Sequence, residues 1–372
     1  MPKKPPRAKN ELPDELADEE LKIASEDDAN EQPPSDIVAF NELRSCADLV
    51  RMKKSDQLEI QPDFQRDVVW SKASQSRFID SLIKQLPIPS MCISLDYKTN
   101  ERMVIDGLQR MSSIINFLDD PTWQISSLKD IDQRVSGRKV SYIKEKHADI
   151  YDRVKNLTIP ITVLRCDYSK REHMKYLFTI FHRLNTGGNK LTNQEIRNCI
   201  FNGPFNNLLK DLVKNSEFRH LLGLKKKKTY RFAYEELVLR FFTFEDGFND
   251  YDGRFANYLN EYMQWACEED DDFDQFLEDK RSLFERTVSV IHDKIQDGTP
   301  LPKLSKATIE AVFVGVGSNI DHMENVTDAK ARKLLNQLRN SDEFHPNELK
   351  NALTSKQKQI DRLTKAVSVF GA

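Results

Sequence analysis

Val104-Ile105-Asp106-Gly107-Leu108-Gln109-Arg110 is the stretch that decides the fold of the first half of this chain. Residues 102–105 predict a short strand, and Asp106 with Gly107 predicts a tight turn. Residues 111–118 then place apolar side chains at i, i+3, i+4 and i+7, which is the spacing of a helix. The sequence therefore predicts a strand that runs through one glycine into a helix.

The start of this predicted helix is suited to an anion. Its first backbone N–H groups have no partner inside the helix, and the helix dipole adds partial positive charge there. Arg110 can donate two hydrogen bonds to a phosphate, while Asp106 and Gln109 can hold a sugar hydroxyl, an attacking water or a metal ion. A turn closed by an ion pair between Asp106 and Arg110 is the structural alternative for the same residues.

Further motifs occur in order on either side of this stretch. They are Phe64-Gln65-Arg66-Asp67-Val68-Val69-Trp70, a helix that ends at Pro87-Ile88-Pro89, then Phe181-His182-Arg183-Leu184-Asn185-Thr186-Gly187-Gly188, and finally Leu191-Thr192-Asn193-Gln194-Glu195-Ile196-Arg197-Asn198. This ordered set resembles the DUF262 family, the N-terminal domain of the GmrSD-type modification-dependent restriction enzymes, whose core is similar to the ParB/sulfiredoxin fold. Leu108 departs from the family pattern, which most often has glutamine there, so a polar role of that side chain is missing here.

The resemblance implies a nucleotide pocket around the central stretch. The catalytic residues that it implies are Asp106, Gln109, Arg110 and Arg66, with Asp106 as a Mg²⁺ ligand. The expected nucleotide-binding residues are Gln65, Arg66, Gly107, Arg110, Ser112, Arg183, Asn185, Gln194 and Arg197. For the last four of these, contact with the ligand and contact with one another both remain open.

The rest of the first half predicts an α+β domain. Residues 91–95, 102–105 and 159–164 have the composition of strands and alternate with helices, which favours a small mixed sheet. Residues 40–52 carry apolar side chains at helical spacing and predict a helix. The resemblance implies that this domain has the ParB/sulfiredoxin-like fold.

From residue 170 onward the pattern predicts helices alone. Thr192, followed three residues later by Glu195, is a capping box and predicts a helix start. Further amphipathic repeats predict an α-helical bundle. The N-terminal residues are rich in proline and charge and poor in large apolar side chains, which predicts disorder. The expected boundaries are a disordered tail over residues 1–35, a nucleotide-binding domain over 36–169 and a helical domain over 170–372.

Composition limits the classes of protein that this chain can be. The chain has 372 residues, 39% of them hydrophobic, and a net charge of −3, so any nucleic-acid contact needs a local basic patch. Its five cysteines are isolated from one another, which fits reduced thiols in the cytoplasm better than disulfides or a zinc site. Neither a signal sequence nor a long apolar run is present. We therefore expect a cytoplasmic protein without a membrane span.

The densest basic cluster outside the N-terminal tail is a candidate patch. Its members are Lys225, Lys226, Lys227, Lys228 and Arg231. A solvated loop is the structural explanation, and contact with the phosphate backbone of DNA is the functional one. A protein partner or a second copy of the chain is an alternative to DNA.

The resemblance also implies what to look for and does not find it. GmrSD-type proteins often join this domain to a DUF1524 His-Asn-His nuclease domain, and here His345-Pro346-Asn347 lacks the second half of such a motif. We therefore expect a stand-alone version of the DUF262 domain.

Three functions remain open from the sequence. In the first, an NTP-hydrolysing module of a bacterial or phage restriction or defence system, Arg110 and the helix start hold phosphates, Arg66 supports the developing charge, and Asp106 with Gln109 positions Mg²⁺ or water. In the second, a ParB-like nucleotide or DNA clamp, ligand binding switches the helical domain without turnover. The third is a DNA-nicking nuclease that uses the same carboxylates.

Overall fold

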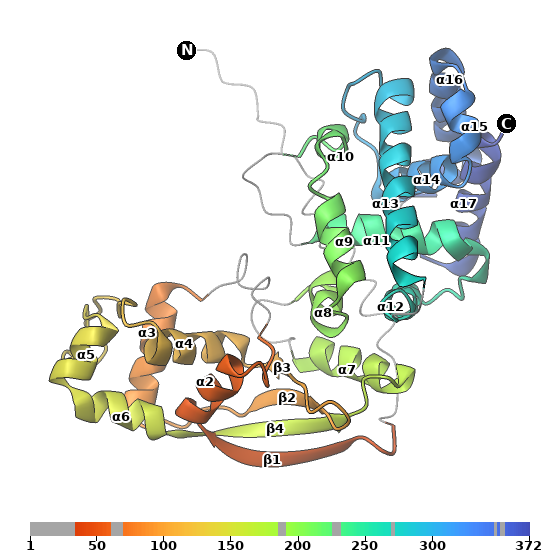
Figure 1. Ribbon diagram of the computed structural model, residues 1–372. Helices are drawn as coiled ribbons and strands as arrows, with labels where there is room; N and C mark the ends of the chain where they lie inside the picture. Colours follow the sequence, from red (N-terminus) through yellow and green to blue (C-terminus); the bar gives the residue numbers. More distant parts are fainter. Residues whose placement is uncertain are drawn as a thin grey trace, which may run out of the picture. The chain divides into compact units, whose positions relative to one another are not determined.

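The computed structural model describes residues 34–60, 70–184, 191–224, 232–268, 272–345, 348–349 and 354–372 (Figure 1). The chain divides into two compact units. The first extends from Glu31 to Leu191, and we call it the sheet unit; the second extends from Thr192 to Ala372, and we call it the helical unit.

The sheet unit is built on a four-stranded sheet in the order β1-β4-β2-β3. The strands are β1 (Val38–Ser45), β2 (Met91–Asp96), β3 (Arg102–Asp106) and β4 (Thr158–Cys166). β1 pairs antiparallel with β4, β2 pairs antiparallel with β3, and β2 pairs parallel with β4. The predicted small mixed sheet of an α+β domain is therefore confirmed.

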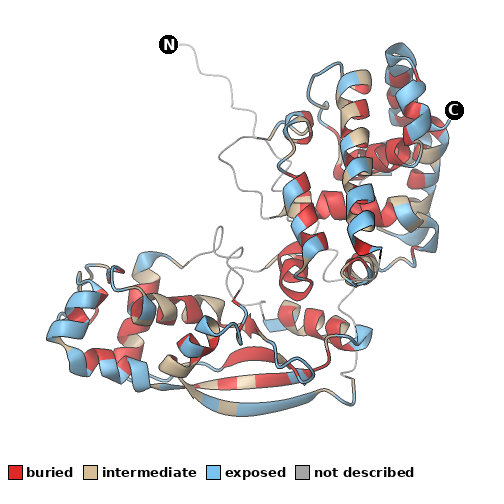
Figure 2. Cartoon of the chain, viewed as in Figure 1, coloured by how far each residue is buried: buried red, intermediate tan, exposed pale blue. Residues whose placement is uncertain are grey.

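Helices supply the rest of the sheet unit's core. They are α2 (Cys46–Lys54), α3 (Lys72–Ile83), α4 (Leu108–Asp119), α5 (Val140–Lys146), α6 (Ala148–Asn156) and α7 (Arg171–Leu184). Leu49, Ile79, Ile114 and Phe117 from these helices and Ile161 from β4 are buried in one cluster. Figure 2 shows the central strands largely buried and β1 exposed along most of its length.

The first strand corrects an expectation from the sequence. The helix predicted for residues 40–52 is instead β1 followed directly by α2. Ser45 ends the strand and caps the helix, because its side chain accepts a hydrogen bond from the backbone N–H of Asp48 at 3.0 Å. The helical spacing across residues 40–45 was overridden by pairing with β4, whose residues are more than a hundred positions away.

The boundary between the two units lies later than expected. We placed it before residue 170, but α7 packs against β3 and belongs to the sheet unit. Its apolar stripe of Met174, Leu177 and Phe181 is buried. A helix with such a stripe stays with the surface that covers it, so the unit ends after α7 rather than before it.

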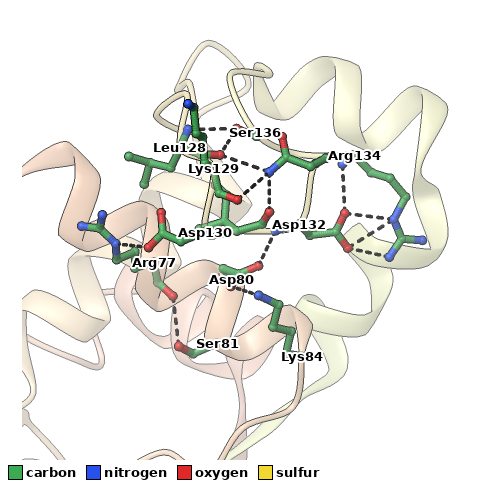
Figure 3. A network of polar contacts seen from close by, with 12 residues as sticks. Arg77, Asp80, Ser81, Lys84, Leu128, Lys129, Asp130, Asp132, Arg134 and Ser136 are labelled. Carbon is green, nitrogen blue, oxygen red and sulfur yellow. Dashed lines mark hydrogen bonds and ion pairs between the residues drawn. The ribbon is translucent and has the colours of Figure 1, made fainter.

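The long connection between α4 and α5 is fastened to α3 by polar contacts (Figure 3). Arg77 of α3 forms an ion pair with Asp130 at 2.7 Å, and the carboxylate of Asp80 accepts a hydrogen bond from the backbone N–H of Asp132 at 2.8 Å. Asp132 in turn pairs with Arg134 at 2.6 Å. These contacts order a connection that contains no regular helix or strand.

The helical unit confirms the predicted helical region. Its helices are α8 (Asn193–Ile200), α9 (Pro204–Leu212), α10 (Ser216–Leu221), α11 (Ala233–Gly247), α12 (Phe255–Trp265), α13 (Phe273–Ser289), α14 (Lys306–Gly317), α15 (Ile320–Asn325), α16 (Asp328–Arg339) and α17 (Lys356–Phe370). Short 3-10 turns η2 (Phe248–Asp250) and η4 (Asp342–Phe344) and a π-helix η3 (Val290–Ile295) complete it. The capping box of Thr192 and Glu195 is present at the start of α8.

α14 is the centre of the helical unit. All of its residues are buried, and α11, α13 and α17 pack around it (Figure 2). Gly315 permits the approach of α17, because a Cβ at this position would lie 2.7 Å from the ring of Phe370 and 2.8 Å from the carbonyl oxygen of Ala366. A larger residue there would push the two helices apart.

Two general features of the described chain complete the fold. All five cysteines are free thiols, four of them buried and Cys267 half-buried. Within the described ranges, no helix has both the length and the apolar composition that crossing a bilayer requires.

Candidate nucleotide site at the β3–α4 turn

The predicted strand–glycine–helix arrangement is present. β3 ends at Asp106, Gly107 is the N-cap, and α4 begins at Leu108. Gly107 has a φ of 102°, in the left-handed region, and a Cβ there would lie 2.6 Å from Cγ of the buried Met91. Both the backbone conformation and the neighbouring side chain therefore require glycine at this turn.

The start of α4 carries no built-in negative partner. Its N-cap makes no side-chain hydrogen bond, and its first turn has no acidic residue. Because the first N–H groups of a helix have no acceptors inside it, this end offers donors and partial positive charge to an anion.

Arg110 is held in place by three contacts around this turn. Nη2 donates to Oδ2 of Asp106 at 2.6 Å, and Nη1 donates to the carbonyl oxygens of Pro89 at 2.5 Å and Ser90 at 3.3 Å. Only 13% of the Arg110 side chain is exposed. The ion pair that the sequence offered as a structural alternative is therefore present, and it fixes the position of the guanidinium.

Asp106 keeps one oxygen open. Its side chain is 35% exposed, and Oδ1 has no hydrogen-bond partner within the described part of the chain. Cys92 lies opposite Asp106 in the β2–β3 pair, and burial, reinforced by the charge of Asp106, raises the pKa of the Cys92 thiol to about 12. The thiol therefore stays protonated at neutral pH, and Asp106 is the reactive group of this strand pair.

Gln109 ties the turn to Trp70. Its Oε1 accepts a hydrogen bond from the backbone N–H of Trp70 at 3.0 Å, and Nε2 of Gln75 donates to the Trp70 carbonyl at 3.2 Å. The Trp70 ring meets the ring of Phe78 edge-on at 5.6 Å, so it packs on α3. The side-chain oxygen of Gln109 is therefore already engaged.

Residues 61–69 start and end beside this turn. Glu59, just before them, bridges to β3, where its N–H donates to the carbonyl of Arg102 at 2.7 Å. Trp70, just after them, is held by Gln109. Gln65 and Arg66 themselves lie outside the described residues, so their expected roles stay predictions.

The other expected site residues fall in different places. Ser112 is buried in α4, and Arg183 is exposed near the end of α7. Asn185, Lys225, Lys226, Lys227, Lys228 and Arg231 lie outside the described residues, so the basic patch stays a prediction. No three His, Cys, Asp or Glu side chains among the residues described are gathered so as to hold a metal ion, so the expected Mg²⁺ contact rests on Asp106.

Gln194 and Arg197 lie inside the helical unit. Both are almost fully buried in α8, and Nη1 of Arg197 donates to Oε1 of Gln194 at 3.2 Å. Arg197 also pairs with Glu236 at 3.3 Å and donates from Nε to Asn260 at 2.8 Å. Of the two possibilities left open by the sequence, contact with one another is the one observed for these two residues.

Glu236 is the centre of this buried network, and the sequence reasoning missed it. Arg240 and Lys306 also contact its carboxylate, at 2.5 Å and 3.2 Å. Burial raises the pKa of Glu236, but the charges of Lys306, Arg240 and Arg197 outweigh it and hold the pKa well below its usual range. A glutamate within the apolar stripe of α11 was the feature that could have indicated a buried ion pair.

The sheet unit is thus a small α+β domain with a polar strand-to-helix turn as its candidate ligand site. A family model described as the GmrSD restriction endonuclease N-terminal domain matches residues 46–202, and this part of the chain belongs to that family. The match covers the sheet unit from α2 onward and extends through α8. The family suggests a restriction or defence type of module.

Two further comparisons gave no relatives. Searches of curated proteins and of solved structures found no match to this chain. The likeness of the sheet unit to ParB and sulfiredoxin therefore stays a prediction.

Proposed function

We propose that the sheet unit binds a nucleoside triphosphate at the β3–α4 turn and hydrolyses it, as part of a restriction or defence system that acts on DNA or is regulated by it. One observation carries this proposal: an uncapped helix start, a fixed arginine and a carboxylate with an open oxygen lie within five residues, Asp106 to Arg110. Membership of the GmrSD N-terminal domain family supports the setting.

Arg110 suits phosphate binding because it is already positioned. The carbonyl groups of Pro89 and Ser90 and the carboxylate of Asp106 fix its guanidinium before any ligand arrives. A guanidinium has five N–H donors, so three contacts leave further donors for phosphate oxygens. Little side-chain entropy would then be lost on binding, which favours affinity.

Asp106 and Gln109 divide the catalytic roles. Mg²⁺ is usually bound through one or two carboxylates together with the phosphates of the substrate, and Oδ1 of Asp106 fits that need. The oxygen of Gln109 is engaged by Trp70, so its Nε2 amide is the group that orients an attacking water. When bound, Mg²⁺ would offset the charge of the phosphates. Arg66 would support the charge that develops on the leaving group.

Phosphate release from the pure full-length chain tests the proposal. Each NTP is supplied with Mg²⁺, with and without DNA. Asp106→Asn keeps the shape and the hydrogen bond to Arg110 but removes the charge, so turnover should fall about 10²-fold or more while nucleotide still binds. Turnover equal to that of the parent would contradict the catalytic role of Asp106.

Arg110→Ala tests the binding role. Nucleotide affinity by calorimetry should fall by a factor that corresponds to about 1.5–3 kcal/mol, the value of a charge-assisted hydrogen bond. Arg77→Ala is the matched control, because it removes an ion pair of similar length from α3 of the same unit. Equal affinities for the parent and Arg110→Ala, with a normal melting curve, would remove Arg110 from the site.

The other two functions are outcomes of the same experiments. Nucleotide binding without phosphate release would favour the clamp. Conversion of supercoiled plasmid into its nicked form, lost in Asp106→Asn, would favour the nuclease. Neither binding nor release with any NTP would refute the proposal.

A further inference from the structure

Two histidines meet at the surface of the helical unit. His220 lies near the end of α10, and His292 lies in the π-helix η3, which packs against α10. Nδ1 of His220 is 3.1 Å from Nε2 of His292, and the two ring planes are inclined at 62°. His220 is exposed and His292 is 16% exposed, so solvent reaches the pair.

A carboxylate supports His292 from its other side. Nδ1 of His292 is 2.7 Å from Oδ1 of Asp293, and Oδ2 of Asp293 accepts a hydrogen bond from the hydroxyl of Ser289 at 3.2 Å. This contact keeps the proton of His292 on Nδ1, so the lone pair of Nε2 faces His220. Histidines that bind metals commonly donate their second N–H to a carboxylate in this way.

The backbone at His292 is unusual. π-helical turns are rare and occur frequently at functional sites. Here Gln296 N–H donates to the carbonyl of Ile291 at 3.0 Å, and Gly298 N–H donates to the carbonyl of His292 at 2.9 Å. The widened turn thus presents His292 and its supporting Asp293 next to α10.

We propose that His220 and His292 bind one divalent transition-metal ion of the zinc type. Imidazole is a suitable ligand for such ions. Two nitrogens at 2.0–2.1 Å from a tetrahedral metal lie about 3.3–3.4 Å apart, so the observed pair needs to open by only a few tenths of an ångström. His220 would move its proton from Nδ1 to Nε2, and both nitrogens that face the ion would then offer lone pairs.

Water completes the coordination of this ion. The two histidines are its ligands from the described residues, since no group of three ligand side chains is found among them. A site with two protein ligands keeps open positions, unlike a closed structural zinc site. This site is independent of the β3–α4 turn and of the proposed nucleotide hydrolysis.

Calorimetric titration of the full-length chain with ZnCl₂ tests the proposal. We expect one Zn²⁺ per chain, with affinity that falls at least about tenfold in His220→Asn and in His292→Asn. Asparagine retains a hydrogen-bond donor near the position of imidazole Nδ1, but its amide nitrogen does not bind zinc. His220→Asn therefore separates metal binding from a simple hydrogen bond between the two residues.

A matched variant and a second readout control for other zinc sites. His322→Asn changes another exposed histidine of the helical unit, which contacts only the C-terminal residue, and should bind Zn²⁺ like the parent. Zn²⁺ should raise the melting temperature of the parent and of His322→Asn but not that of His220→Asn. Equal zinc affinity in the parent and His220→Asn, or no saturable binding at all, would show that the pair is only a hydrogen bond.

Discussion

Replacing Gly107 by alanine should destabilise the sheet unit by about 2–5 kcal/mol. The left-handed backbone, with a φ of 102°, costs about 1–2 kcal/mol for a residue with a Cβ. The new Cβ would also lie 2.6 Å from Cγ and 2.9 Å from Sδ of Met91, which is 2% exposed. Forcing this side chain aside in a packed core adds about 1–3 kcal/mol.

The sheet unit can be followed separately from the helical unit. Trp70 and Trp123 belong to the sheet unit and Trp265 belongs to the helical unit, so Trp265→Phe confines the tryptophan fluorescence to the sheet unit. Urea unfolding of Gly107→Ala in this background should show a lower midpoint with little change in slope.

Met91→Ala provides the matched control for the steric part of this cost. Without the Met91 side chain, Gly107→Ala should cost about 1–2 kcal/mol, the backbone contribution alone. The difference between the two backgrounds measures the clash as a coupling energy. Equal costs in both backgrounds would show that Met91 does not restrict this position, and a cost below about 0.5 kcal/mol in either would contradict the turn geometry.

Three further predictions concern charged residues. Glu236→Gln should destabilise the helical unit by about 3–5 kcal/mol, measured by thermal melting, because buried cations lose their counter-charge. Hydrogen bonds from Lys170 and His173 lower the pKa of Asp36 to about 2, so its stabilising effect is present above its ordinary pKa and is lost as the pH falls through about 2; the difference in urea midpoint between the parent and Asp36→Asn should shrink between about pH 5 and pH 2. Changing Lys225, Lys226, Lys227 and Lys228 to glutamine should weaken DNA binding and flatten its dependence on log salt by roughly 0.9 per lost phosphate contact, while NTP turnover without DNA stays the same; an unchanged slope would leave these lysines as a solvated loop.

Pairs of distant residues show where reasoning from sequence stopped. The local pattern could not separate ligand contact from mutual contact for Gln194 and Arg197, because Glu236 and Asn260, which receive Arg197, come from α11 and α12. The histidine pair is a similar case. His220 and His292 are 72 positions apart, so no spacing in the sequence indicates that they meet.

The sequence by itself determined the features that depend on neighbouring residues. The strand–glycine–helix turn at Gly107 and the capping box at Thr192 follow from hydrogen bonds and backbone preferences that act within a few residues. The tertiary structure alone decided that residues 38–45 form a strand, that α7 belongs to the sheet unit, and that Arg110 is fixed by the carbonyl groups that precede β2. These outcomes depend on which surfaces are buried against one another, and burial joins residues whose separation along the chain carries no local pattern.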